Sequence, residues 1–114
     1  MVSISAAREI ALSFDEAMEQ PHFEKTSFRV RKKIFATLDF KLHQMVFKFS
    51  EVDQSVFCEY DPSVIYPVAG AWGKKGWTFV ELKKVPKKLF LDAITTSYCQ
   101  VAPKTLATKY RSAQ

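Results

Sequence analysis

The sequence has few of the residues on which several common kinds of site depend. Its 114 residues include only three glycines, two cysteines and two histidines. No glycine-rich phosphate loop is present, and no cysteines or histidines are clustered at metal-ligand spacing. No window approaches the roughly 18 consecutive apolar residues of a membrane-spanning helix. These absences argue against a phosphate-loop nucleotide site, a zinc site and a transmembrane segment.

The cysteines and histidines also give no catalytic pattern. Cys58 and Cys99 lie far apart and belong to no Cys-x-x-Cys pair, and each occurs in an apolar helical pattern. We therefore expect two buried free thiols rather than a disulfide or metal ligands. His22 or His43 could in principle pair with a cysteine as a base, but no spacing predicts this. We expect no catalytic residue, no metal, no cofactor and no enzyme activity.

The N-terminus and the composition indicate an ordinary globular domain. The first residues lack the charged lead and the long apolar run of a secretory signal, so a cytoplasmic protein is expected. Hydrophobic residues make up 47% and aromatic residues 14% of the chain, which is enough for a packed core. We expect one domain over residues 1–114, as a monomer.

Charge is distributed unevenly along the chain. Residues 1–24 contain one basic and five acidic side chains, a net charge of −4. The remaining 16 basic and seven acidic side chains give +9, and the whole chain carries +5. A basic body next to an acidic start favours an anionic partner on the basic side, although a merely soluble surface is the plain alternative.

Hydrophobic periodicity predicts an α+β fold. The expected elements are a helix at residues 4–19, strands at 28–30 and 33–37, a strand at 42–49, a helix from Ser50 to Tyr60, strands at 64–71 and 77–82, a long helix from Pro86 to Val101 and a short helix at 105–110. Short connections favour an antiparallel sheet of about five strands with helices packed on one face. The side chains expected to point inward are Ala7, Ile10, Ala11, Phe14 and Met18 from the first helix, Val52, Val56, Phe57 and Tyr60 from the second, and Leu89, Phe90, Ala93, Ile94, Ser97, Tyr98 and Val101 from the long helix.

Two hairpins with basic tips are the main functional prediction. The segment Gly73–Gly76 is expected to form a tight loop, with Trp72 and Trp77 facing each other across the hairpin as a packed pair. Arg31 and Lys32 separate the strands expected at 28–30 and 33–37, which predicts a second hairpin with a basic tip. This pair fits the left-handed conformations of a type I′ turn poorly, so a loop of more than two residues is the alternative.

Lysines and arginines close to tryptophans are what a nucleic-acid surface needs, because cations contact phosphates and flat rings can stack on bases. Four of the lysines precede or begin the long helix, where they oppose the helix dipole. The candidate nucleic-acid-binding residues are Arg29, Arg31, Lys32, Lys33, Trp72, Lys74, Lys75, Lys83, Lys84, Lys87 and Lys88. The alternative is a solvated basic rim around packed tryptophans.

The pair Ser97 and Tyr98 lies near the end of the long helix. A serine hydroxyl bonded to the backbone and a tyrosine packed on the sheet explain this pair better than catalysis does. We therefore expect a structural role for both residues.

The sequence resembles the MmcQ/YjbR-like family over nearly its whole length. The segments that carry the resemblance are His22–Val30, Lys33–Leu38, Trp72, Trp77–Leu82, Ser97-Tyr98 and Val101–Lys104. The most specific parts are the Phe-x-Val block followed by Lys-Ile-Phe-Ala, and the late Ser-Tyr pair. One departure is that the family often has glycine in the first hairpin, where this chain has Arg31-Lys32.

The resemblance implies a fold similar to CyaY and frataxin and a bacterial, cytoplasmic DNA-binding protein with two hairpin wings. Three hypotheses follow. The first is weak, sequence-tolerant binding of duplex DNA through backbone contacts at the two basic tips. The second is metal or iron binding by the acidic face of the first helix, at Asp15, Glu16 and Glu19. The third is a protein-interaction domain or an enzyme of unknown type, for which no residue gives evidence.

Overall fold

The computed structural model describes residues 1–111 and has α+β architecture. Its elements are α1 (Ile4–Leu12), β1 (Met18–His22), β2 (Lys25–Val30), β3 (Lys33–Asp39), β4 (Gln44–Lys48), α2 (Glu51–Cys58), β5 (Ile65–Pro67), α3 (Ala71–Lys74), β6 (Trp77–Glu81), α4 (Lys87–Val101) and α5 (Lys104–Arg111). The predicted fold class is confirmed, with six strands in place of about five.

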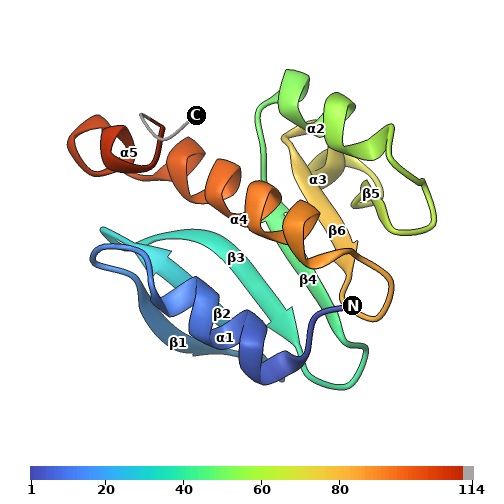
Figure 1. Ribbon diagram of the computed structural model, residues 1–114, viewed down its shortest axis with the longest axis horizontal. Coiled ribbons are helices and arrows are strands. Elements are labelled where there is room, and N and C mark those ends of the chain that lie inside the picture. The colour runs from blue at the N-terminus through green and yellow to red at the C-terminus, as the bar shows by residue number, and fades with distance from the viewer. Residues whose placement is uncertain (112–114) are drawn as a thin grey trace.

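The six strands form one antiparallel sheet in the order β1-β2-β3-β4-β6-β5. The chain leaves the sheet after β4, forms α2, adds β5 at the far edge, and returns through α3 to place β6 between β4 and β5 (Figure 1). Both edge strands contain a proline, Pro21 in β1 and Pro67 in β5. Proline removes a backbone donor and so protects an open edge from pairing with another chain.

The core lies between the sheet and its helices. Helix α4 runs across β3 and β4 (Figure 1), and α5 packs against α4. The predicted inward residues Phe90, Ala93, Ile94, Ser97 and Tyr98 are all buried. They meet alternate residues of the strands, because successive side chains of a strand point to opposite faces. The opposite face of the sheet carries the half-buried residues of the same strands.

The first helix is shorter than predicted. It is capped by Ser3, whose hydroxyl accepts from the amide of Ala6 at 3.1 Å, and it ends at Leu12. The segment Met18–His22, predicted to begin inside this helix, pairs with β2 as an edge strand. Met18 is therefore 60% exposed and not in the core. Backbone pairing with a neighbouring strand has overridden the local helical pattern.

The second helix begins as predicted, but most of its predicted inward face is exposed. Ser50 caps it by accepting from the amide of Asp53 at 3.1 Å. Its contact with the core is made by Phe57, whose ring stacks on Phe49 with centroids 4.9 Å apart. Three other side chains that were predicted to point inward are exposed: Val52 is 72% exposed, Val56 59% and Tyr60 54%. The helix sits at one end of the sheet, so only a narrow stripe of its surface is covered.

The predicted hairpin at Gly73–Gly76 is wrong. Residues Ala71–Lys74 form the short helix α3, and Trp72 and Trp77 do not pair across two strands. Gly73 permits this, because a Cβ there would lie 1.8 Å from the carbonyl oxygen of Val68. Gly76, at φ 103°, turns the chain into β6. The second basic tip is therefore a helical turn and not a hairpin wing.

The first basic tip is the predicted hairpin, with a two-residue loop in place of the longer alternative. Val30 pairs directly with Lys33, so Arg31 and Lys32 alone make the turn. Both have positive φ, 50° and 71°, which is the type I′ geometry that matches the twist of two antiparallel strands. Arginine and lysine rarely adopt this conformation. The sheet twist has overridden the local preference of both residues.

Both cysteines are free thiols, as predicted. Cys99 is buried and Cys58 is partly buried. Burial raises the pKa of both thiols, which makes the thiolate form unfavourable. Neither thiol therefore has the lowered pKa of a reactive cysteine.

Candidate nucleic-acid interface

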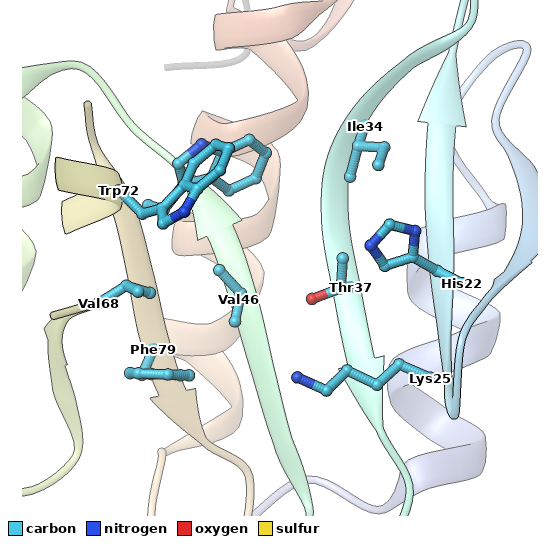
Figure 2. A pocket seen from close by; sticks show the side chains of 9 residues that line it. His22, Lys25, Ile34, Thr37, Val46, Val68, Trp72 and Phe79 are labelled. Carbon is cyan, nitrogen blue, oxygen red and sulfur yellow. The ribbon is translucent and has the colours of Figure 1, made fainter. Parts of the chain in front are cut away.

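The face of the sheet opposite α4 is hollowed into a groove of about 380 Å³, called here the aromatic groove. Its floor consists of half-buried residues of β3, β4 and β6, which are Ile34, Thr37, Val46 and Phe79. One wall consists of Val68, Trp72 and Trp77, and the other of His22 and Lys25. Figure 2 shows His22 and Lys25 reaching in from the β1–β2 side, opposite Trp72 and Val68.

A second depression adjoins the aromatic groove at the end of the sheet where α4 ends. Its lining residues are Arg29, Lys32, Lys33, Ile34, Lys48, Trp77, Gln100 and Val101. Four of these carry positive charge, and among the described residues that line it none is acidic. We call it the basic depression. It shares Ile34 and Trp77 with the aromatic groove, so the two hollows lie side by side.

Each of the two tryptophans lies beside a lysine ammonium. The Lys75 Nζ is 5.3 Å from the centre of the Trp72 ring, and the Lys48 Nζ is 5.6 Å from the centre of the Trp77 ring. These distances are within the range of a cation–π interaction. Trp72 is 60% exposed, and Trp77 is half-buried on the uncovered face of the sheet. Neither belongs to the core, contrary to the prediction of a packed pair.

Lys48 is held in place where the two hollows meet. Its ammonium also donates to the backbone carbonyl of Lys75. Burial and, secondarily, the charge of Lys75 lower the pKa of Lys48. An anion placed between these two lysines would relieve both effects, because an opposite charge favours the protonated ammonium.

The predicted basic residues are divided between two ends of the molecule. Arg29, Lys32 and Lys33 gather in the basic depression, and the exposed Lys74 and Lys75 lie at the end of α3 beside it. Four further lysines precede or begin α4; they are Lys83, Lys84, Lys87 and Lys88. They are exposed, but α4 has 15 residues and separates them from the basic depression by about 20 Å. The structure therefore does not bring all the predicted site residues together.

Arg31 and the acidic residues of the N-terminal segment have structural partners. The predicted acidic helix face does not exist, because Asp15, Glu16 and Glu19 all follow the end of α1. The three carboxylates form separate ion pairs, which are Asp15–Lys109 (3.2 Å), Glu16–Arg31 (2.6 Å) and Glu19–Arg8 (2.6 Å). Within residues 1–111 no three histidine, cysteine or acidic side chains are placed to hold a metal ion. The three carboxylates therefore do not share one helix face, which is the arrangement on which the metal-binding hypothesis depended.

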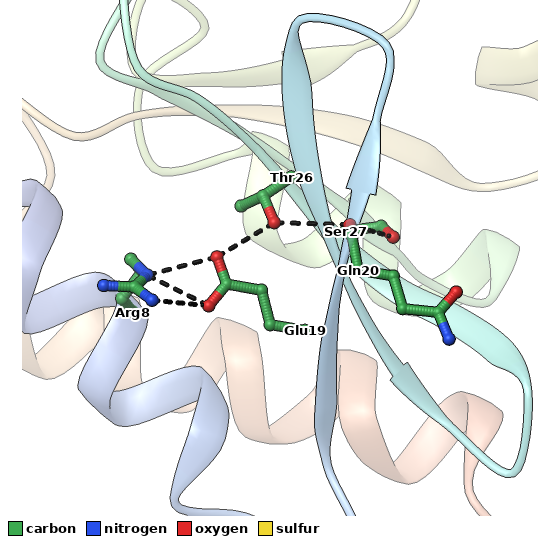
Figure 3. Close-up of polar contacts among 5 residues, drawn as sticks. All are labelled: Arg8, Glu19, Gln20, Thr26 and Ser27. Carbon is green, nitrogen blue, oxygen red and sulfur yellow. Dashed lines mark hydrogen bonds and ion pairs between the residues drawn. The ribbon is translucent and has the colours of Figure 1, made fainter.

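The Arg8–Glu19 pair joins α1 to the edge of the sheet (Figure 3). The Arg8 Nε lies 3.1 Å from both carboxylate oxygens of Glu19, and the hydroxyl of Thr26 donates to the same carboxylate at 2.9 Å. Thr26 and Ser27 also donate to the carbonyl of Gln20, which ties β1 to β2. The hydrogen bond from Arg8 is the main reason that the pKa of Glu19 is lowered.

This lowered pKa predicts an acid-sensitive contribution to stability. The contribution is complete above 4.5, the ordinary glutamate value, and is lost as the pH falls through the depressed value of the folded state. We expect the urea midpoint of the wild type to fall more steeply below that pH than the midpoint of Glu19→Gln. Glu9→Gln, which removes an exposed carboxylate of α1, is the matched control. Parallel pH profiles for wild type and Glu19→Gln would contradict this account.

Several residues of the candidate interface could not be identified from lysine and arginine clusters. His22, Lys25 and Phe79 line the aromatic groove and Lys48 lines the basic depression, but the four residues lie in separate strands. Strand alternation places Lys48 and Phe79 on the side of β4 and β6 opposite the buried Phe47 and Val80. An aromatic residue at such an outward strand position is the sequence signal that could have identified this face.

The comparisons with known proteins agree with this fold. The YjbR family model matches residues 12–100. The structure is similar to the crystal structure of Deinococcus radiodurans protein DR2400, described with the family-model domain DUF419. The TM-score is 0.79 at 20% sequence identity, and the alignment covers 97% of this chain and 89% of that chain. No match was found among curated proteins.

No helix among the described residues is long and apolar enough to cross a membrane. The matched residues 12–100 contain every strand of the sheet and most of α4. They include every residue that lines the two hollows except Val101. The chain belongs to the YjbR family.

Proposed function

We propose that this protein binds DNA weakly and with little sequence preference, through phosphate contacts in the basic depression. The observation that carries the proposal is that Arg29, Lys32, Lys33 and Lys48 line one hollow without an acidic neighbour in its lining. Cations gathered in this way attract a polyanion and release its counterions on binding. Such contacts position a nucleic acid but do not read its sequence.

The backbone of the first hairpin supports the same conclusion. Arg31 and Lys32 both occupy the left-handed conformation, which glycine or asparagine would adopt more easily. Arg31 gains an ion pair with Glu16 from this position. Lys32 instead extends the cationic lining of the basic depression. The turn thus holds an exposed lysine at the edge of a cationic hollow, where a phosphate can contact it.

The proposal predicts a strong dependence of DNA affinity on salt. Four phosphate contacts give a log–log salt slope of about −3.6 on duplex DNA and about −2.8 on a single strand. The slope for duplex DNA corresponds to a loss of affinity of about 150-fold between 50 and 200 mM salt. Changing both Lys32 and Lys33 to alanine should make the slope on duplex DNA shallower by about 2. Mobility shift or fluorescence anisotropy across a salt series measures both quantities.

The matched control removes two lysines from the other end of the molecule. Lys83→Ala with Lys84→Ala changes net charge by the same amount, so it should leave the slope almost unchanged if the basic depression is the site. The free energy of unfolding of both double variants should lie within about 0.5 kcal/mol of the wild-type value, because the replaced side chains are exposed. A slope near zero for the wild type refutes phosphate binding, and equal effects of the two double variants refute the location.

A further inference from the structure

We propose that the aromatic groove takes unpaired bases, so that the preferred ligand is single-stranded nucleic acid. This inference rests on the proposed function for its phosphate contacts, and it adds a second set of contacts to the bases. It assigns the uncovered face of the sheet, which the wing hypothesis did not use, as the main binding surface.

The groove offers flat rings that no other part of the described chain covers completely. Trp72 is 60% exposed although it is one of the largest apolar side chains. Trp77 and Phe79 are half-buried and face the same hollow. A volume of about 380 Å³ lies within the range of small-molecule sites, which begins at about 300 Å³. The space therefore suits flat ring systems of the size of a base.

Cations accompany these rings at short range. Lys75 lies beside Trp72 and Lys48 beside Trp77, each ammonium within 6 Å of the ring centre. A nucleotide presents the same combination, since it joins a flat base to a phosphate. Base–aromatic stacking with adjacent phosphate contacts is the usual means by which proteins bind single strands. The paired arrangement of ring and ammonium occurs twice here.

The groove and the basic depression can serve one continuous strand. They share Ile34 and Trp77, so bases in the groove would lie next to phosphates at Lys33 and Lys48. This charge complementarity favours a polyanion over an apolar peptide or a neutral ligand. A duplex would fit only in part, because its bases are already stacked and paired and cannot reach a tryptophan face.

The tip of the β1–β2 hairpin adds another aromatic residue next to the groove. Phe23 is 96% exposed and has φ 60°, a conformation that bulky side chains rarely adopt. Its ring centroid is 5.2 Å from that of His22, which lines the groove. A further stacking partner at this position would extend the surface beyond the hollow itself.

Intrinsic fluorescence gives a direct test, because both tryptophans of the chain line the groove. The probes are an oligothymidylate of about 12 nucleotides, within the usual site size of single-strand-binding folds, an abasic strand of the same length and charge, and a blunt duplex. We expect tryptophan quenching by the oligothymidylate and affinity at least about 5-fold above that of the abasic strand and the duplex. Oligouridylate distinguishes RNA from DNA.

The variant Trp72→Ala isolates the stacking contact. It should weaken oligothymidylate binding by about 5- to 150-fold, the range for loss of one stacked base, and should leave the salt slope and the affinity for the abasic strand unchanged. Its melting temperature should stay close to the wild-type value, because the side chain is exposed. Tyr60→Ala, which removes an aromatic ring of similar exposure outside the groove, is the control.

The outcomes separate this inference from the proposed function. Equal binding of oligothymidylate and abasic strand, or an unchanged affinity in Trp72→Ala, overturns base binding and leaves phosphate binding in place. Absence of binding to every nucleic-acid probe overturns the proposed function and this inference with it. Polyglutamate that binds as tightly as oligothymidylate would show that the surface selects charge alone, and it also overturns base binding.

Discussion

Replacing Tyr98 with alanine is expected to lower the free energy of unfolding by about 3–5 kcal/mol, the range for removal of a large buried aromatic side chain. Tyr98 is completely buried. Its ring stacks on Phe14 with centroids 4.6 Å apart and contacts Phe35 and Tyr110 edge-on at 5.4 and 5.2 Å. A cavity among three other aromatic rings cannot close easily, because each ring is also held by its neighbours.

The hydroxyl of Tyr98 has a second role. It donates to the carbonyl of Asp15 at 2.7 Å, while the amide of Asp15 donates to the hydroxyl of Tyr110 at 2.9 Å. Two tyrosines thus hold both backbone groups of the residue that leads from α1 into β1. Burial is the main reason that the pKa of Tyr98 is raised to about 12, so the hydroxyl stays protonated and can donate.

Urea unfolding of Tyr98→Ala, Tyr98→Phe and Tyr60→Ala separates the packing of the ring from its hydrogen bond. Tyr98→Phe should cost only about 0.5–1.5 kcal/mol, because it removes one hydrogen bond and leaves the ring in place. Tyr60 is 54% exposed, so Tyr60→Ala should cost far less than Tyr98→Ala. Equal costs for the two alanine variants would show that Tyr98 is not the centre of this aromatic cluster.

Replacing Ser97 with alanine is expected to lower the free energy of unfolding by roughly 2–6 kcal/mol, because it removes the partner of one buried and one partly buried backbone group at about 1–3 kcal/mol each. The Ser97 hydroxyl donates to the carbonyl of Phe35 at 2.6 Å and accepts from the amide of Lys48 at 2.8 Å. The β3–β4 pairing ends at Ala36 and Phe47, and Phe35 and Lys48 would be the next pair of the ladder. The hydroxyl therefore takes the place of the next ladder hydrogen bond.

The irregularity of β3 explains why a side chain is needed at this point. The pairing of β2 with β3 shifts register between Phe28 and Arg29, so that Ala36 and then Ile34 are the successive partners. Phe35 is the extra residue of this bulge, and a bulged residue is left outside the regular ladder. Ser97 reaches it from α4 and closes the end of the ladder.

Thr96→Ala is the matched control for Ser97→Ala, since the hydroxyl of Thr96 donates only within its own helix, to the carbonyl of Asp92. It should change stability by less than about 0.5 kcal/mol. Ser97→Ala should also weaken phosphate binding, because Lys33 and Lys48 flank the loosened ends of β3 and β4. If Ser97→Ala is as stable as Thr96→Ala, the strands bond directly and the bridge is dispensable.

These two residues form the Ser-Tyr pair that is among the most specific parts of the family resemblance. The structural role expected for them is confirmed by their burial and their hydrogen bonds. Neither lines the aromatic groove or the basic depression. Ser97 joins β3 to β4, and Tyr98 packs on Phe35 of β3. The candidate interface lies on the other face of these strands.

The sequence alone determined those elements whose hydrophobic period is long and regular. The spacing from Leu89 to Val101 predicted α4 and its buried face, and the aromatic and β-branched residues of Trp77–Leu82 predicted β6. The Ser50 cap predicted the start of α2. In each of these cases a local signal, whether a period, a residue composition or a capping side chain, agrees with the tertiary contacts, so no competing interaction overrides it.

Only the tertiary structure decided the elements that depend on a partner elsewhere in the chain. Met18–His22 becomes a strand because β2 offers it backbone hydrogen bonds, and α3 forms because Gly73 can approach the carbonyl of Val68. The candidate interface is of the same kind. Its residues come from separate strands, and they meet only because the antiparallel register brings Lys48 opposite Trp77 on the face that the helices leave uncovered. Register is a long-range property, since one step of slippage would move every side chain to the other face.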